Sequence, residues 1–323
     1  VLSSTIFGGV SGSAVADASA IGSLLIPWQK RLGYPPAFSA ATLAAAATID
    51  ILIPPSIPMI LFALVSNTSI ASLFVAGILP GLAMCAGFMV VCWWVGRRRN
   101  FPRETRPLDW AAFRKQLVYA APALVLPVLI VVLLRFGIAT PTEVAVLSTL
   151  FAGLVSALVY RDLGIKRLHD AIVHAGLATG VVLLVIMASA AIGWLLTFDR
   201  MPDGIVAWAQ AHLSSGWSVI LLMNLLMLVC GMFIDLPAAV LLLTPVFVPL
   251  ANSIGMDLTQ LGIMMTVNLA IGLYTPPVGT TLFITSALAK VKVGQTVREL
   301  GPFYVVAFLI LALVSYVPAV IFK

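Results

Sequence analysis

The feature that most limits the fold of this chain is a series of apolar runs, each long enough to cross a bilayer as a helix. Crossing the hydrocarbon core takes about 20 apolar residues. Such runs lie at residues 72–95, 116–134, 141–160, 171–198 and 303–322. Only 9% of the residues are charged, whereas about a quarter are charged in a soluble domain. The sequence therefore predicts an all-α membrane protein that crosses the bilayer several times.

Other apolar segments are interrupted by polar or helix-breaking residues. Residues 1–30 have two short apolar arms around GVSGSAVADAS, which predicts a re-entrant hairpin that enters and leaves by one face. Residues 37–66 are broken by IPPSIP, where proline removes backbone donors, so we expect two half-helices joined by unwound chain. The same plan returns as a hairpin at 217–254, around GMFIDLPAA, and a broken helix at 260–289, interrupted at YTPPVG.

This second occurrence indicates an internal repeat. One ungapped shift of 222 positions pairs Pro27 with Pro249, Pro54 with Pro276, Pro55 with Pro277, Pro80 with Pro302, Gly9 with Gly231 and Gly33 with Gly255. We therefore divide the chain into a first repeat at 1–96, ending in a helix at 72–95, and a second repeat at 217–323, ending in a helix at 303–322. Residues 97–216 connect the repeats through whole spans and an interfacial helix around Trp208.

The basic residues predict the orientation of the repeats. If residues 1–30 enter from the cytoplasm, most of the 18 Lys and Arg residues fall in cytoplasmic loops, and only Arg135, Arg200 and Lys323 lie on the other side. An odd number of spans then separates the repeats, so the second is inverted relative to the first. The net charge of +6 thus reflects topology, and we expect contact with the lipid bilayer and not with nucleic acid.

Inverted repeats with hairpins and broken helices are typical of secondary transporters, whose site lies near the midplane. Unwound carbonyls there bind cations, and helix N-termini favour anions. Intramembrane acidic residues mark functional sites, so Asp17 and Asp235 are candidates for a cation or substrate role, with capping of a hairpin helix as the alternative. Glu143 follows Pro141 and Thr142 at a helix start, which favours N-terminal capping.

Two other functions can be weighed against a transporter. Intramembrane aspartates could form an aspartyl protease dyad, but the chain lacks a GxGD string. An ion channel is the second alternative, although a continuous pore would not need two opposed hairpins. The cysteines Cys85, Cys92 and Cys230 lie in apolar runs without a CxxC pair, so we interpret them as packing residues.

Several strings resemble one known family. GGVSGSAVADASAIGS, IPPSIPMI, PTEVAVLS, GMFIDLPAAVLLLTPVFVPLA and NLAIGLYTPPVGTTLF are similar to the large membrane subunit of the tripartite ATP-independent periplasmic (TRAP) transporters. The resemblance covers the whole chain. In the family several further helices precede the first hairpin, so we expect a longer protein. No enzyme activity is implied.

The resemblance implies a multi-pass protein of the bacterial inner membrane that takes up organic acids such as C4-dicarboxylates or sialic acid. It implies Na⁺ as the driving ion, a periplasmic substrate-binding protein that delivers the substrate, and a small membrane subunit as a partner. It also implies an elevator motion. The moving block would comprise residues 1–66 and 217–289, against a scaffold of 72–198 and 303–322.

Site residues follow from the same resemblance. A first Na⁺ would bind Ser11 and Ser13 together with backbone oxygens of Asp50, Ile53 and Pro55. A second Na⁺ would bind at Gly231, Gly272, Thr275 and Val278. The substrate would contact Ser13, Asp17, Ser56, Asp235, Pro276 and Thr280. Asp50 departs from the family, which usually has glycine there, and its carboxylate either strengthens cation binding or points away into water.

Overall fold

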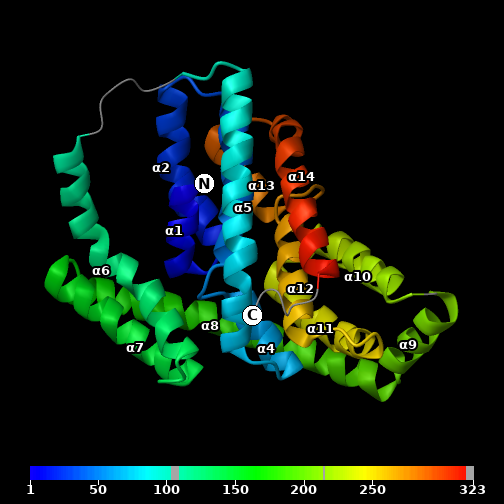
Figure 1. Ribbon diagram of the computed structural model, residues 1–323. Helices are drawn as coiled ribbons and strands as arrows, with labels where there is room; N and C mark the ends of the chain where they lie inside the picture. Colours follow the sequence, from blue (N-terminus) through cyan, green and yellow to red (C-terminus); the bar gives the residue numbers. More distant parts are fainter. Residues whose placement is uncertain (103–108, 214, 318–323) are drawn as a thin grey trace.

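The computed structural model describes residues 1–102, 109–213 and 215–317 (Figure 1). Within these ranges the regular structure is entirely helical, and 7 helices are long and apolar enough to cross a membrane. This confirms the all-α membrane protein predicted from the apolar runs. The elements are α1 (Leu2–Ser11), α2 (Ala14–Arg31), α3 (Pro36–Ala46), η1 (Ala47–Ile51), α4 (Ile57–Ser66), α5 (Ile70–Arg98), α6 (Trp110–Arg135), α7 (Pro141–Leu154), η2 (Val155–Val159), α8 (Ile165–Phe198), α9 (Met201–His212), α10 (Gly216–Gly231), α11 (Leu236–Ser253), α12 (Leu258–Gly272), α13 (Thr280–Ala289) and α14 (Val293–Tyr316).

Several helices begin before the apolar runs that predicted them. The starts expected at 116, 171 and 303 lie at Trp110, Ile165 and Val293 instead. Apolar runs report only the part of a helix that is suited to hydrocarbon, whereas the helix itself continues until its first amides find a cap. For α6 that cap is the Asp109 carboxylate, which accepts from the amides of Ala111 and Ala112 at 3.0 and 3.1 Å.

Some parts of the sequence prediction lie outside the described residues. These are Arg103 and Arg106 of the charged cytoplasmic loop, the end of the last span at 322, and Lys323. The described part of that span ends with α14 at Tyr316.

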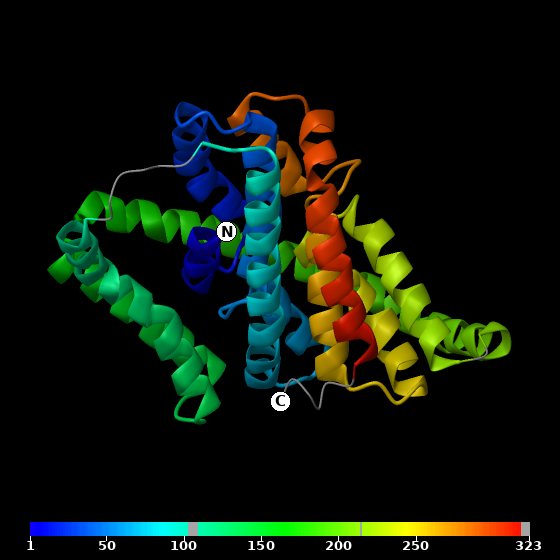
Figure 2. The same cartoon turned by 45° about the horizontal axis from the view of Figure 1, so that its top comes forward.

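Helices related by the shift of 222 positions correspond closely in their bounds. Both ends of α2 (Ala14–Arg31) and α11 (Leu236–Ser253) differ by this shift. Another such pair, α5 and α14, packs side by side and runs in opposite directions, as the colours along each helix show (Figures 1 and 2). Helices related by inverted repeats are expected to run in opposite directions. That the hairpins enter and leave the bilayer by one face stays a prediction.

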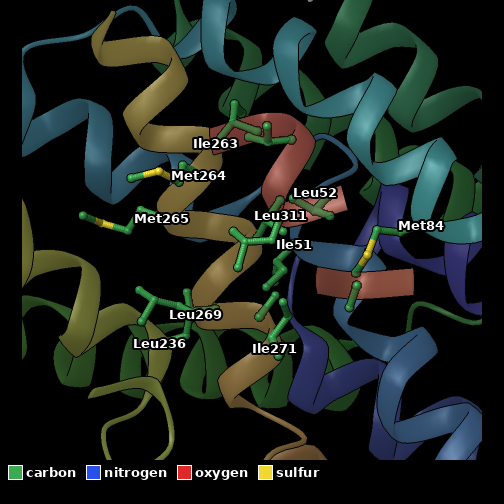
Figure 3. Packing of buried hydrophobic residues seen from close by; sticks show 14 of the residues in the cluster. Ile51, Leu52, Met84, Leu236, Ile263, Met264, Met265, Leu269, Ile271 and Leu311 are labelled. Atoms are coloured by element: carbon green, nitrogen blue, oxygen red, sulfur yellow. The ribbon is translucent and has the colours of Figure 1, made fainter. Parts of the chain in front are cut away.

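The core is built around the two broken helices. Every residue from Phe38 to Leu52 and from Thr259 to Tyr274 is buried. Figure 3 shows α12 side chains such as Met264 and Leu269 in one buried cluster with Ile51, Leu236 and Leu311, and α12 contacts η1, α5, α11 and α14. A broken helix exposes backbone groups that lipid cannot satisfy, so enclosing it in protein is the physically favourable arrangement.

The connecting helices are far less enclosed. The percentages of buried residues in the most apolar stretch of each span are 0% for α8, 11% for α6 and 6% for Pro141–Val159, which comprises α7 and η2. Figures 1 and 2 show α6 and α7 at one side of the molecule and α9 and α10 at the other, with α8 running behind α5 between them. These apolar surfaces suit contact with lipid or with a further membrane subunit.

Candidate functional site

Both helical hairpins and both breaks contribute to one cavity. Its volume is about 220 Å³, and Ser13 and Asp235 line it from the two hairpin loops. Its lining residues are Gly12, Ser13, Ala14, Val15, Ile51, Ile57, Pro58, Asp235, Leu236, Pro237 and Leu273. The cavity therefore lies where the two repeats meet, and the N-termini of α2, α4 and α11 open onto it.

Two serines of the first hairpin loop form hydrogen bonds within the loop and with the start of α2. Ser13 is the N-cap of α2 and its Oγ accepts from the amide of Ala16 at 3.4 Å, while the Ser11 hydroxyl donates to the Ser13 carbonyl at 3.4 Å. Between them Gly12 adopts a left-handed conformation with φ 63°, which glycine tolerates best. A side chain there would also collide with the Pro55 carbonyl oxygen, so the loop lies directly against the first break.

At the first break the polar side chain serves the backbone. Ser56 is buried and caps α4: its hydroxyl donates to the Ile51 carbonyl at 2.6 Å and accepts from the amide of Met59 at 3.4 Å. The Ser56 hydroxyl therefore forms its hydrogen bonds with the backbone of the protein itself. Ile53, a predicted backbone ligand, directs its side chain toward α5, since a Cβ on Gly81 would lie 2.8 Å from Ile53 Cδ1.

The second hairpin lies against the second break through backbone contact. A Cβ on Gly272 would come 2.5 Å from the carbonyl carbon and oxygen of Gly231, so the two glycines allow main chain to touch main chain. The amide of Val278 donates to the Met232 carbonyl at 3.3 Å, which joins the hairpin loop to the unwound segment. Gly231, Gly272 and Val278, predicted to share an ion site, are thus brought together.

The remaining residues predicted in the second break differ in how their polar groups are used. Thr275 donates from Oγ1 to the Ile271 carbonyl at 2.6 Å, the local bond that threonine often forms in helices. Thr280 begins α13, and its Oγ1 is buried without a hydrogen-bond partner among the described residues. Pro276 is half-buried and, like Pro54 in the first break, precedes a second proline through a cis peptide bond.

Asp235 is exposed at the start of α11. It occupies the N-cap position, yet its side chain forms no capping hydrogen bond with α11. This observation disfavours the capping alternative for Asp235. Asp235 is instead one of the residues that line the cavity. Ser13, which stands at the position related to Asp235 by the shift of 222, caps its own helix instead.

The other acidic residues have different surroundings. Asp17 and Asp50 are buried, and neither is among the residues that line the cavity. Glu143 forms a capping box with Thr140, in which the Thr140 amide donates to the carboxylate at 2.7 Å and the Glu143 amide donates to the Thr140 hydroxyl at 3.4 Å. The predicted capping role of Glu143 is confirmed.

The sequence pattern does not identify every residue that lines the cavity. Gly12 could have been identified, because glycine between two serines at a hairpin tip signals a left-handed turn. Leu273 and Ile51 carry no such signal, since an apolar residue beside a break looks like any other core residue. Only the packing of the two breaks assigns them to the cavity.

Comparison with known proteins identifies the family. The chain matches the family model of the tripartite ATP-independent periplasmic transporter, DctM component, over residues 1–320. It is 58% identical to the uncharacterized protein y4mL of Sinorhizobium fredii, over 99% of this chain and 76% of that protein. It is 36% identical to the C4-dicarboxylate TRAP transporter large permease protein DctM of Pseudomonas aeruginosa, over 99% of this chain and 75% of the relative.

A third relative is the sialic acid TRAP transporter large permease protein SiaM of Vibrio cholerae, which is 34% identical over 98% of this chain and 74% of its own length. The relatives with a named role are transport permeases, which excludes the aspartyl protease considered from the sequence. The chain therefore belongs to the DctM component family of TRAP transporters, multi-pass membrane proteins for secondary transport of organic acids with a periplasmic binding protein and a small membrane subunit.

Proposed function

We propose that this chain is the Na⁺-coupled, elevator-type subunit that moves an organic acid across the bacterial inner membrane after a periplasmic binding protein delivers it. The observation that carries this proposal is the cavity shared by Ser13 and Asp235, where both hairpin loops meet both breaks. C4-dicarboxylates and sialic acid, which name the substrates of two relatives, are both carboxylates, so we expect a carboxylate substrate here.

The electrostatics of the cavity provide a reason for ion coupling. The positive ends of α2 and α11 open onto it and attract a carboxylate. The exposed carboxylate of Asp235 opposes that attraction, because like charges that share one cavity repel each other. A cation beside Asp235 removes the repulsion, so substrate and Na⁺ bind more strongly together than alone.

The close contacts at each break support the two Na⁺ sites. At the first, Gly12 lies against the Pro55 carbonyl oxygen, and Ser11 and Ser13 are beside it in the hairpin loop. At the second, Gly272 lies against the Gly231 carbonyl. Carbonyl and hydroxyl oxygens are the ligands that hard cations prefer, and unwound backbone in transporters supplies them.

Uptake measurements test the function. The complete transporter, reconstituted in proteoliposomes with its small subunit and binding protein, should accumulate a labelled organic acid only with a Na⁺ gradient and only with the binding protein. Replacing Na⁺ by K⁺ at equal ionic strength is the control. Uptake that persists without Na⁺, or without the binding protein, would refute that part of the proposal.

The elevator motion can be tested with a cysteine that the chain already has. Thr42 of α3, in the proposed moving block, lies with its Oγ1 3.9 Å from the Sγ of Cys92 in α5, in the proposed scaffold. A Thr42→Cys substitution places two thiols at this boundary. Oxidation should join them and stop uptake, and reduction should restore it, because the block can no longer move past the scaffold.

The matched control combines Thr42→Cys with Cys92→Ser, which removes the partner thiol. Oxidation should leave the uptake rate of this variant unchanged. Full uptake by protein shown to be cross-linked between residues 42 and 92 would contradict movement at this boundary.

A further inference from the structure

Two carboxylates are enclosed in the protein without partners. Asp17 and Asp50 are both 0% exposed. All of their carboxylate oxygens lack a hydrogen-bond partner, and within residues 1–102, 109–213 and 215–317 neither forms an ion pair. Burying a carboxylate without compensation is very costly, so buried charges are paired or bind metal ions.

The two groups lie close to one another. Asp17 is in the first turn of α2 and Asp50 is in η1, and both α1 and α2 pack against η1. The two carboxyl groups are near enough to repel each other. Gly8 of α1 makes room for Asp50, because a Cβ on Gly8 would lie 2.6 Å from Asp50 Cα.

A hydroxyl group completes the cluster. Ser4 lies one helical turn before Gly8, so the two residues share one face of α1. The Ser4 side chain is 0% exposed and interacts with the Asp17 carboxyl group, but at a geometry that falls short of a hydrogen bond. Its Oγ is therefore a further buried oxygen without a partner, close to the Asp17 carboxyl group.

These oxygens have the composition of a site for a hard cation. The cluster offers only carboxylate and hydroxyl oxygens, and hard cations prefer such ligands whereas softer metals take nitrogen or sulfur. The positive N-terminal end of α2 compensates part of the charge on Asp17. Since a helix end carries only about half a positive charge, more than one negative charge remains, and a monovalent cation balances most of it.

We propose that Asp17, Asp50 and Ser4 form a further Na⁺ site, enclosed between α1, α2 and η1. It differs from the first site proposed above, which takes only the backbone oxygen of Asp50, because its ligands are the carboxylates of Asp17 and Asp50 and the hydroxyl of Ser4. It also exists in one repeat only, since the shift of 222 places Ala239 and Gly272 opposite Asp17 and Asp50. The inference rests on the proposed Na⁺ coupling, and it moves Asp17 from the substrate to the ion.

Equilibrium binding of ²²Na⁺ to the purified complete transporter tests this site. Asp17→Asn and Asp50→Asn should each bind one Na⁺ fewer per chain than the wild type, and the double variant should lose no more than either single variant. Asp170→Asn, an exposed acidic residue of α8, is the matched control and should bind as the wild type does. Unchanged stoichiometry in both single variants would overturn the proposal.

Thermal unfolding separates loss of the site from loss of the fold. Without Na⁺ the Asn variants should melt at the wild-type temperature or above it, because a buried repulsion is gone. Added Na⁺ should raise their melting temperature less than that of the wild type, since a bound ligand stabilises the folded state. An equal Na⁺-induced rise would overturn the proposed site. A wild-type protein that binds no Na⁺ at all would instead refute the proposed ion coupling.

Discussion

The two hairpin-and-break pairs share a helical plan but hold their helix ends by different interactions. In the first, Ser13 and Ser56 cap α2 and α4 with their side chains. In the second, α11 and α13 have no side-chain cap, and the exposed Asp235 stands where the first pair has Ser13. The first pair bonds helix amides to serine side chains, whereas in the second pair the amide of Thr281 donates to the Leu273 carbonyl and the Asp235 carboxylate forms no cap.

The interiors of the two pairs differ as well. Gly8 accommodates the side chain of Asp50 in the first, while in the second Gly231 and Gly272 bring two backbones into contact. The prolines of the breaks recur in both copies, but Gly12 of the first hairpin tip and most of the polar side chains do not, since the shift of 222 places Ile234 opposite Gly12. The comparison shows that an internal repeat can conserve geometry while its two halves take different chemical roles.

The largest effect is expected where the second pair depends on backbone contact. Gly272→Ala should lower the stability of the protein by about 1–3 kcal/mol, the usual cost of overpacking, because its Cβ would lie 2.5 Å from the Gly231 carbonyl carbon. Thermal unfolding of the detergent-purified protein measures this. Gly294→Ala, which meets nothing within 4 Å, is the control. Equal melting temperatures for the two variants would show that the contact is dispensable.

The exposed carboxylate of the second pair should matter for transport more than for folding. Asp235→Asn should reduce Na⁺-driven uptake about tenfold, equivalent to roughly 1.4 kcal/mol, and leave membrane insertion intact. The reason is that the variant loses the charge that attracts a cation to the cavity. Asp199→Asn, an exposed residue outside the cavity, serves as the comparison. Uptake kinetics equal to those of the wild type would remove Asp235 from the site.

The smallest effect is expected from the cap that only the first pair has. Ser56→Ala should cost about 1 kcal/mol of stability, because the amide of Met59 and the carbonyl of Ile51 lose their partner. Its counterpart Val278 is exposed, and Val278→Ala should change stability by less than about 0.5 kcal/mol. If the two variants unfold alike, the difference in capping has no energetic consequence.

Much of the helical plan could be predicted from local sequence. The tip at Gly12 and the breaks at Pro54 and Pro276 coincide with observed interruptions, because glycine and proline change backbone conformation at their own positions. The starts of α6 and α14 could not be predicted from hydropathy, since helix ends depend on caps that lie outside the apolar run.

What the sequence alone determined is the membrane location, the helical hairpins and breaks, and the family, all of which depend on patterns within short stretches of chain. Only the tertiary structure decided that Ser13 and Asp235 line one cavity, that the Ser56 hydroxyl is used by the backbone, and that Asp17 and Asp50 are both buried without hydrogen-bond partners. Some of these contacts join residues that are distant in the sequence. Others determine which of several possible partners a side chain bonds. They are set by how whole helices pack, which no local pattern specifies.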